Sequence, residues 1–191
     1  MVEFSTGGYA STSIATIAAR ANTSTGNVYK YFANKEDLFF STIPAELVRE
    51  LRRLLRLRIT ALGVERDTNK LSPNHAYRDA TNQMLSFSME HRPQILFLLE
   101  RSEDSPHAGF VRTLVDDLTR LALAYARRAY PGTRVTPALR RSLRRIYAAF
   151  LSHIASLLAE EPRPAQMTQA LEWLSLYHLT GLQSLFGKRK P

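Results

Sequence analysis

The chain has 191 residues, of which 45% are apolar and none is cysteine, and its formal net charge is +9. This apolar content suffices for a packed core, while the absence of cysteine excludes disulfides, thiolate metal sites and cysteine nucleophiles. There is no run of about 18 apolar residues and no signal-peptide pattern, so we expect no membrane span. These absences fit a reducing cytosol, and a cytoplasmic location is expected mainly from the function predicted below.

Residues 11–38 begin with a short helix and a tight turn. Its apolar positions recur at helical spacing: Ile14, Ile17, Ala18 and Ala21. This pattern predicts a helix over 13–21, capped by Thr12 or Ser13. Asn22 can take the left-handed conformation that ends a helix, and Ser24 is the next N-cap, so the turn is short.

A second helix is predicted over 25–32, with Val28 and Phe32 facing inward one turn apart. Its outward side chains are Thr25, Gly26, Asn27, Tyr29 and Lys30. A helix that reads the major groove needs short polar groups together with an aromatic or basic side chain. Asparagine can form two hydrogen bonds with the edge of adenine. Gly26 costs about 1 kcal/mol of helix propensity, which fits a close backbone approach to a ligand. The segment therefore predicts a DNA-reading helix-turn-helix.

A third helix is predicted to start after Asn34, with Asp37 completing a partial capping box. Lys35 lies at its N-terminus, where a cation and free amide groups suit a phosphate oxygen. The alternative is a helical corner without a ligand, because such caps occur in most all-helical domains. Exposed tyrosines beside Asn27 and Lys30 favour DNA, since solvated faces more often carry Glu, Lys and Ala.

This stretch resembles the signature of the tetracycline-repressor (TetR/AcrR) family of bacterial transcriptional regulators. The matching residues are Gly8-Tyr9, Thr12-Ser13, Ile17-Ala18, Ala21 to Phe32 and Asn34 to Leu38. The match is ordered and ungapped, and it departs only where Asn22 and Thr23 replace the usual Gly-Val. Beyond these residues the chain resembles only the family's general plan of a large helical domain.

The resemblance implies two sets of DNA contacts. The bases would meet Thr25, Gly26, Asn27, Tyr29 and Lys30. The phosphate backbone would be contacted by Thr12, Ser13, Tyr31 and Lys35. The resemblance also implies a longer first helix, of which residues 1–4 are only the last turn. We therefore expect either a start site placed too far downstream or a truncation. Without the rest of that helix, the stabilisation lost from unburied apolar side chains would be on the order of 5–8 kcal/mol.

The rest of the chain lacks strand-like alternation, so the predicted class is all-α. We expect a helix-turn-helix DNA-binding domain at 1–46, its first helix truncated, and a helical effector-binding and dimerisation domain at 47–191. The expected elements are helices at 35–62 with a break at Pro44, a linker at 63–74, and helices at 75–91, 93–102, 106–130, 137–160 and 164–186.

The middle helices are predicted to enclose a pocket for a small-molecule effector. Its candidate lining is Tyr77, Met84, Phe87, His91, Phe97, Phe110, Leu114, Leu118, Tyr125, Phe150 and His153. Ordinary core is the alternative for each, because aromatic and methionine side chains fill cores more often than cavities. An effector would shift the population of conformers through the 35–62 helices.

The last two helices are too broadly apolar for one packing partner. By resemblance we expect a dimeric four-helix bundle, with internal core helices as the alternative. The expected interface residues are Leu143, Phe150, Ala170, Leu174, Tyr177 and Gly181. A homodimer would place its paired heads on palindromic half-sites about 34 Å, or a multiple of this, apart.

The sequence also bears on two other functions. The charges of residues 1–45 sum to zero, and arginines gather instead in 49–58 and 134–145, with Lys188–Lys190 at the tail. The alternative function is thus a helical module whose basic face binds an acidic partner without reading DNA sequence. An enzyme is not expected, because the adjacent pairs Glu90-His91, Glu103-Asp104 and Glu160-Glu161 diverge by about 100 degrees on a helix. Nor do we expect a metal or cofactor, since no such motif occurs.

The sequence therefore predicts a ligand-responsive transcriptional regulator. Its partners would be double-stranded operator DNA, an unknown small molecule and a second copy of the chain. Repression is the output that the resemblance favours.

Overall fold

The computed structural model describes residues 2–160 and 163–187, and within them the chain is helical without strands, which confirms the all-α prediction. The elements are α1 (Val2–Gly7), α2 (Ile14–Arg20), α3 (Thr25–Val28), α4 (Lys35–Thr42), α5 (Ala45–Ala61), the 3₁₀ turn η1 (Thr68–Lys70), α6 (Ala76–Glu90), α7 (Arg92–Glu100), α8 (Phe110–Ala129), α9 (Pro137–Glu160) and α10 (Pro164–Gly187). Among the described helices, none is long and apolar enough to cross a bilayer.

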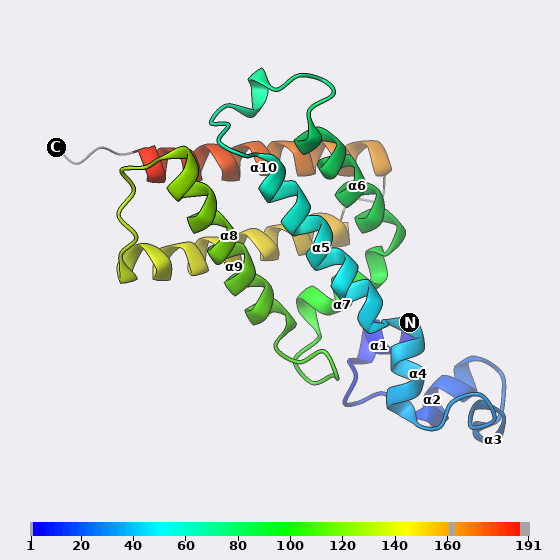
Figure 1. The fold of residues 1–191 in the computed structure, drawn as a ribbon. Helices are drawn as coiled ribbons and strands as arrows, with labels where there is room; N and C mark the ends of the chain where they lie inside the picture. The colour runs from blue at the N-terminus through cyan, green and yellow to red at the C-terminus, as the bar shows by residue number, and fades with distance from the viewer. Residues whose placement is uncertain (1, 161–162, 188–191) are drawn as a thin grey trace.

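The helices form a small head and a larger body (Figure 1). Helices α1 to α4 gather at one end, and α5 runs from that end into the body, where it packs against α6 and α8. Helices α9 and α10 form an antiparallel pair on the far side of the body from α3. The head and the end of the body that carries α10 are therefore connected along α5.

Two hydrophobic clusters hold the described residues together. The small one contains Ile14, Ala18, Val28 and Leu38 and joins α2, α3 and α4. The large one runs through α5 to α10 and also takes in Phe4, Phe39 and Ile43 from the head side. The head thus has a core of its own and is also packed against the body through α1 and α4.

Three predicted boundaries differ from the structure. The second helix ends at Val28, and the chain continues to Phe32 as a turn in which the Lys30 amide bonds the Asn27 carbonyl at 3.2 Å. Pro106 does not open a helix, because the chain first turns at Gly109, whose φ of 73° is left-handed, and α8 follows. The first helix continues to Gly7 rather than ending at Phe4. The predicted break at Pro44 is confirmed.

Candidate functional site

Helix α2 is closed at both ends by hydrogen bonds that its sequence provides. The Ser13 hydroxyl accepts from the Thr16 amide at 3.0 Å, so Ser13 is the N-cap. At the other end, Asn22 takes a φ of 50°, and the Thr23 amide donates to the Ala18 carbonyl at 2.9 Å. This is a Schellman closure with asparagine in the position that glycine usually takes. It brings α3 in immediately after α2.

Helix α3 and the turn that follows it present all five predicted base-reading residues to solvent. The Ser24 hydroxyl caps it by accepting from the Asn27 amide at 3.1 Å, and Val28 is buried beneath it. The exposed residues are Thr25, Gly26, Asn27, Tyr29 and Lys30. The Asn27 side-chain amide donates to the Thr23 hydroxyl at 2.9 Å, which orients it and leaves its oxygen available. Such an oriented amide can both accept and donate at a base edge.

The predicted phosphate-contacting residues separate into two groups. Ser13 and Tyr31 are exposed, and Tyr31 retains 75% of its accessible surface. Thr12 is buried, and its hydroxyl donates to the Gly8 carbonyl at 2.6 Å, so its side chain ties α2 to the end of α1 instead of facing a phosphate. Ser13 and Tyr31 are therefore the exposed members of this set, and the Ser13 hydroxyl also caps α2.

Lys35 also has a structural role that the sequence did not reveal. Its ammonium group donates to the Tyr9 carbonyl at 2.8 Å and lies 4.2 Å from the centre of the Tyr9 ring. The Tyr9 ring in turn packs against Phe4 and Phe39. Burial, with the charge of Glu36, raises the pKa of Tyr9. Lys35 therefore holds the turn between α1 and α2 against α4.

The partial capping box of α4 is closed in a modified form. The Asn34 side chain accepts from the Asp37 amide at 2.8 Å, as expected for an N-cap. The Asp37 carboxylate accepts from the Ala33 amide at 2.9 Å, one residue before the cap. The shorter aspartate thus fixes the segment that leads out of the reading region.

Two of the three basic side chains of the head are held by contacts within the chain. Arg20 forms an ion pair with Glu3 at 2.8 Å, and Lys35 is held by the backbone. Among the described residues of the head, Lys30 is the exposed cation that has neither kind of partner. Positive charge available to DNA is therefore concentrated beside α3.

The head contacts the body where α4 meets α5. The His107 Nε2 lies 2.9 Å from the Ile43 carbonyl, and because that oxygen only accepts, the ring must donate. Arg101 donates to the Thr6 carbonyl at 3.3 Å. The Phe39 ring, which is fully buried, lies 5.5 Å from the ring centre of His107. These contacts join α1 and the end of α4 to the body.

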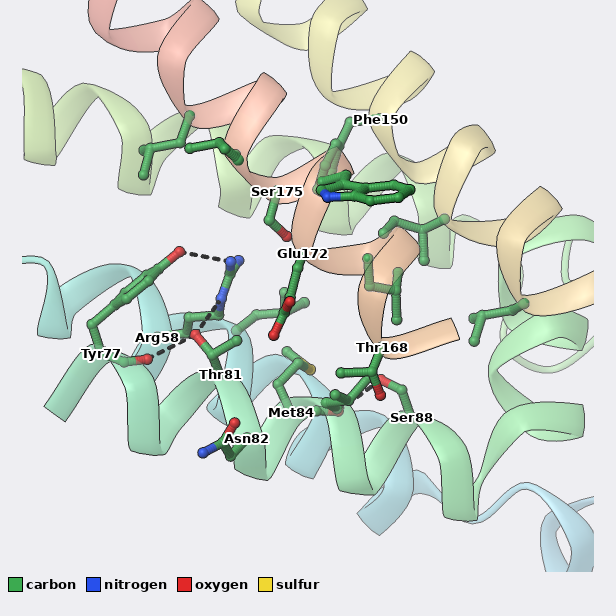
Figure 2. A pocket seen from close by; sticks show the side chains of 18 of the residues that line it. Arg58, Tyr77, Thr81, Asn82, Met84, Ser88, Phe150, Thr168, Glu172 and Ser175 are labelled. Atoms are coloured by element: carbon green, nitrogen blue, oxygen red, sulfur yellow. Dashed lines mark hydrogen bonds between the residues drawn. The ribbon is translucent and has the colours of Figure 1, made fainter. Parts of the chain in front are cut away.

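The body contains a cavity of about 540 Å³ between α5, α6, α8, α9 and α10 (Figure 2). Five predicted lining residues are found there: Tyr77, Met84, Leu114, Leu118 and Phe150. The other predicted residues do not line it: Phe87, His91, Phe97, Phe110, Tyr125 and His153.

Those six residues have other surroundings. Phe97, Phe110 and Tyr125 are buried in the core. Phe87 and His91 pack on each other with ring centres 4.5 Å apart, while His153 is exposed. Aromatic character alone therefore did not separate the cavity wall from the core.

Sequence reasoning also missed the polar part of the cavity wall. The polar lining includes Arg58, Thr81, Asn82, Ser88, Thr168, Glu172 and Ser175. Arg58 follows Leu51 and Leu55 at spacings of seven and three residues, so it continues an apolar helix face. The sequence signal that could have identified Arg58 is a charged residue at a position that otherwise continues an apolar helix face.

The predicted dimer residues are only partly at the surface. Leu143 is fully buried within the protomer, so it is a core residue with no surface to offer a partner. Phe150, which packs on His178 at a ring distance of 4.0 Å, is half-buried, as are Ala170 and Leu174. Tyr177, by contrast, is 78% exposed.

Further exposed residues lie on the same helix pair. Gly181, another of the predicted interface residues, is exposed. The exposed large apolar side chains near Tyr177 in sequence are Trp173 and Leu176, and Ile146 is exposed on α9. The described part of α9 and α10 thus carries apolar surface that the protomer does not cover.

The arginines of α5 are largely engaged within the chain. Arg53 pairs with Glu50 at 2.7 Å, and Arg52 pairs with Asp117 of α8 at 2.5 Å. Burial disfavours ionisation of Asp117, but hydrogen bonds from Arg120 and Arg52 outweigh it and lower its pKa. Because of these pairs, few arginines of the 49–58 cluster remain available to an acidic partner.

Two features singled out in the sequence lie outside the described residues. They are Glu161, from the adjacent pair Glu160-Glu161, and the basic tail Lys188–Lys190.

Comparison with known proteins gives one match. Residues 1–42 match the family described as bacterial regulatory proteins, tetR family. Neither a curated protein nor a solved structure matches the chain. The matched segment ends with α4 and contains the whole α2–α3 unit with its exposed face. Residues 1–42 are thus identified as a helix-turn-helix of the tetR family of bacterial regulatory proteins, which supports a DNA-binding transcription regulator.

Proposed function

We propose that the protein is a ligand-responsive repressor that binds palindromic operator DNA as a homodimer in the cytoplasm. Residues 1–46 would form the DNA-binding domain and 47–191 the effector-binding and dimerisation domain. The observation that carries the proposal is the α3 face, where polar and aromatic side chains are exposed over a buried Val28. No catalytic activity is proposed.

The α3 face has the chemistry that base reading requires. Asn27 offers a donor and an acceptor to adenine, and Lys30 a donor to guanine or phosphate. Tyr29, 56% exposed, adds a ring that can pack on a thymine methyl. Tyr31 and Ser13 flank this face, where they would contact phosphates and set the register.

The homodimer is supported by the uncovered apolar surface of α9 and α10. Trp173 is 66% exposed and Tyr177 is one helical turn further along. Aromatic side chains of this size are typical of interface centres. A two-fold dimer would give each operator two reading helices and thereby the affinity that one short helix lacks.

Ligand response is supported by the path from the cavity to the head. Leu51, Leu55 and Arg58 of α5 line the cavity, and the same helix starts just after Ile43. A ligand that displaces α5 would act on α4 through this junction and change the distance between the two heads. Such coupling requires different ligand affinities in the two conformers.

The test is DNA binding by fluorescence anisotropy, using DNA that flanks the protein's own gene, a scrambled competitor and a salt series. Tyr29→Ala should remove preference at particular bases, whereas Tyr31→Ala should weaken all sequences alike and leave the salt dependence unchanged, because a neutral hydroxyl displaces no counterion. The two variants lose the same side chain two residues apart and so control for each other. Equal binding to the scrambled DNA by the unaltered protein would refute the proposal and favour a basic module that does not read sequence.

A further inference from the structure

The polar contacts inside the cavity are centred on Arg58. Its Nε donates to the Thr81 hydroxyl at 3.0 Å and an Nη donates to the Tyr77 hydroxyl at 2.7 Å (Figure 2). The guanidinium also lies 5.0 Å from the centre of the Tyr77 ring. Arg58 is thereby fixed at the cavity wall rather than extended into solvent.

The charge of Arg58 is not neutralised within the described part of the chain. None of the ion pairs found among those residues includes Arg58. Its partners are neutral hydroxyls, and they use two of its five N–H groups. A half-buried guanidinium charge is costly without a neighbouring anion.

The neighbouring hydroxyls leave a surplus of donors. The Thr81 hydroxyl accepts from Arg58 and donates to the Tyr77 carbonyl at 2.7 Å, so it is satisfied. The Tyr77 hydroxyl accepts from Arg58, and for its own proton no acceptor is found among the described residues. Arg58 and Tyr77 together thus present donors to the cavity.

The positive field of Arg58 extends beyond its direct contacts. Burial, and then the charge of Arg58, lower the pKa of His178 to about 4. Burial raises the pKa of Tyr147, and Arg58 acts in the opposite direction. An acceptor with negative charge would be stabilised in the same field.

The cavity wall also has an apolar part, which would contact the rest of the ligand. It includes Leu51, Leu55, Met84, Leu114, Leu118 and Phe150. Glu172 faces this space from α10, but it is exposed, so water screens its charge more effectively than that of Arg58. A volume of about 540 Å³ falls within the range of small-molecule sites.

We infer that the effector is an amphipathic organic anion whose carboxylate is bound by Arg58 and Tyr77 while its apolar body fills the space beside Met84 and Phe150. This inference rests on the proposed function, because it names the chemistry of the ligand to which that regulator responds. A carboxylate accepts two parallel bonds from a guanidinium, which fits the unused N–H groups.

The test measures ligand binding to the DNA-free protein by the fluorescence of Trp173, the chain's single tryptophan, which also lines the cavity. The probes are decanoate, decan-1-ol and decylamine, which share one alkyl chain and differ in head group. Decanoate should bind about 10- to 100-fold more tightly than decan-1-ol. Arg58→Gln should abolish this preference, and Tyr77→Phe should reduce it.

Arg56→Gln is the matched control, because Arg56 is an exposed arginine of the same helix and does not line the cavity. Circular dichroism verifies that each variant is folded, and Tyr77→Phe, which keeps the ring, tests the inference if Arg58→Gln does not fold. Equal binding of the three probes, tighter binding of decylamine, or a preference that survives Tyr77→Phe and Arg58→Gln alike would overturn the inference.

The same preparations are assayed for operator binding by anisotropy. Loss of DNA sequence preference with decanoate preference intact would contradict the proposed regulator and support the anion site. Sequence-specific DNA binding with no head-group preference would contradict the anion site alone.

Discussion

Replacing Lys35 by alanine should destabilise the head rather than merely remove a DNA contact. The substitution deletes the hydrogen bond from the ammonium group to the Tyr9 carbonyl and the contact with the Tyr9 ring. A hydrogen bond from a charged donor contributes about 1.5–3 kcal/mol, and a cation–π contact at an exposed site about 0.5–1 kcal/mol. Because Lys35 is only half-buried, the lower values apply, and the expected loss is about 2 kcal/mol.

Urea unfolding followed by circular dichroism measures this loss, and Lys30→Ala is the matched control. Lys30 is exposed without a partner in the described head, so its substitution should change the free energy of unfolding by less than about 0.5 kcal/mol. In DNA binding the order should reverse. Lys30→Ala should lower the slope of log affinity against log salt by about 0.9 per protomer, while folded Lys35→Ala should keep the original slope.

A Lys35→Ala protein as stable as the unaltered one, with a reduced salt slope, would refute this reasoning. It would show that the ammonium group leaves the Tyr9 carbonyl and binds phosphate instead. The two substitutions remove the same side chain from positions five residues apart, so differences between them reflect local contacts and not net charge.

Three further predictions concern the turn, the body and the oligomer. Asn22→Val should lower the free energy of unfolding by about 1–2 kcal/mol, because a β-branched residue resists the left-handed conformation, while Asn22→Gly should not lower it. Thermal unfolding distinguishes the two variants, and equal effects of both would contradict the turn argument. Acidification from pH 6.5 to 4 should destabilise the protein by about 3 kcal/mol, because the unfolded chain takes up a proton near pH 6.5 that buried His178 accepts only near pH 4. Urea unfolding of His178→Phe should show a smaller pH dependence, and an unchanged one would exclude His178 as the source. Tyr177→Arg should shift a dimer to monomer in light scattering, whereas Ser86→Arg on exposed α6 should not; a Tyr177→Arg dimer would count against the proposed interface.

Local hydrogen bonding explains why the reading region could be predicted from sequence. Ser13, Asn22, Ser24 and Asn34 each act on backbone groups within a few residues, so their roles follow from spacing alone. The prolines that start α9 and α10 have the same local character. In contrast, Lys35 binds a carbonyl 26 residues away, and no periodic pattern encodes that contact.

The cavity was harder to predict because its wall depends on tertiary packing. Phe110 and Leu114 lie one turn apart on α8, yet Leu114 lines the cavity and Phe110 is buried in the core. Both positions have the same hydrophobic pattern, and only the placement of α5 and α6 separates them. The same limit affected Leu143, since an apolar stripe does not tell which side of a helix meets its own protomer.

The separation of the two hydrophobic clusters has a consequence for how such a protein can diversify. Val28, the anchor of α3, packs only within the small cluster, and the bonds from His107 and Arg101 end on main-chain oxygens, which every residue type possesses. Substitutions on the outer side of α3 can therefore change its exposed face while the packing of the body stays intact. In a regulator of the proposed kind, DNA specificity and ligand specificity would then be able to change independently of each other.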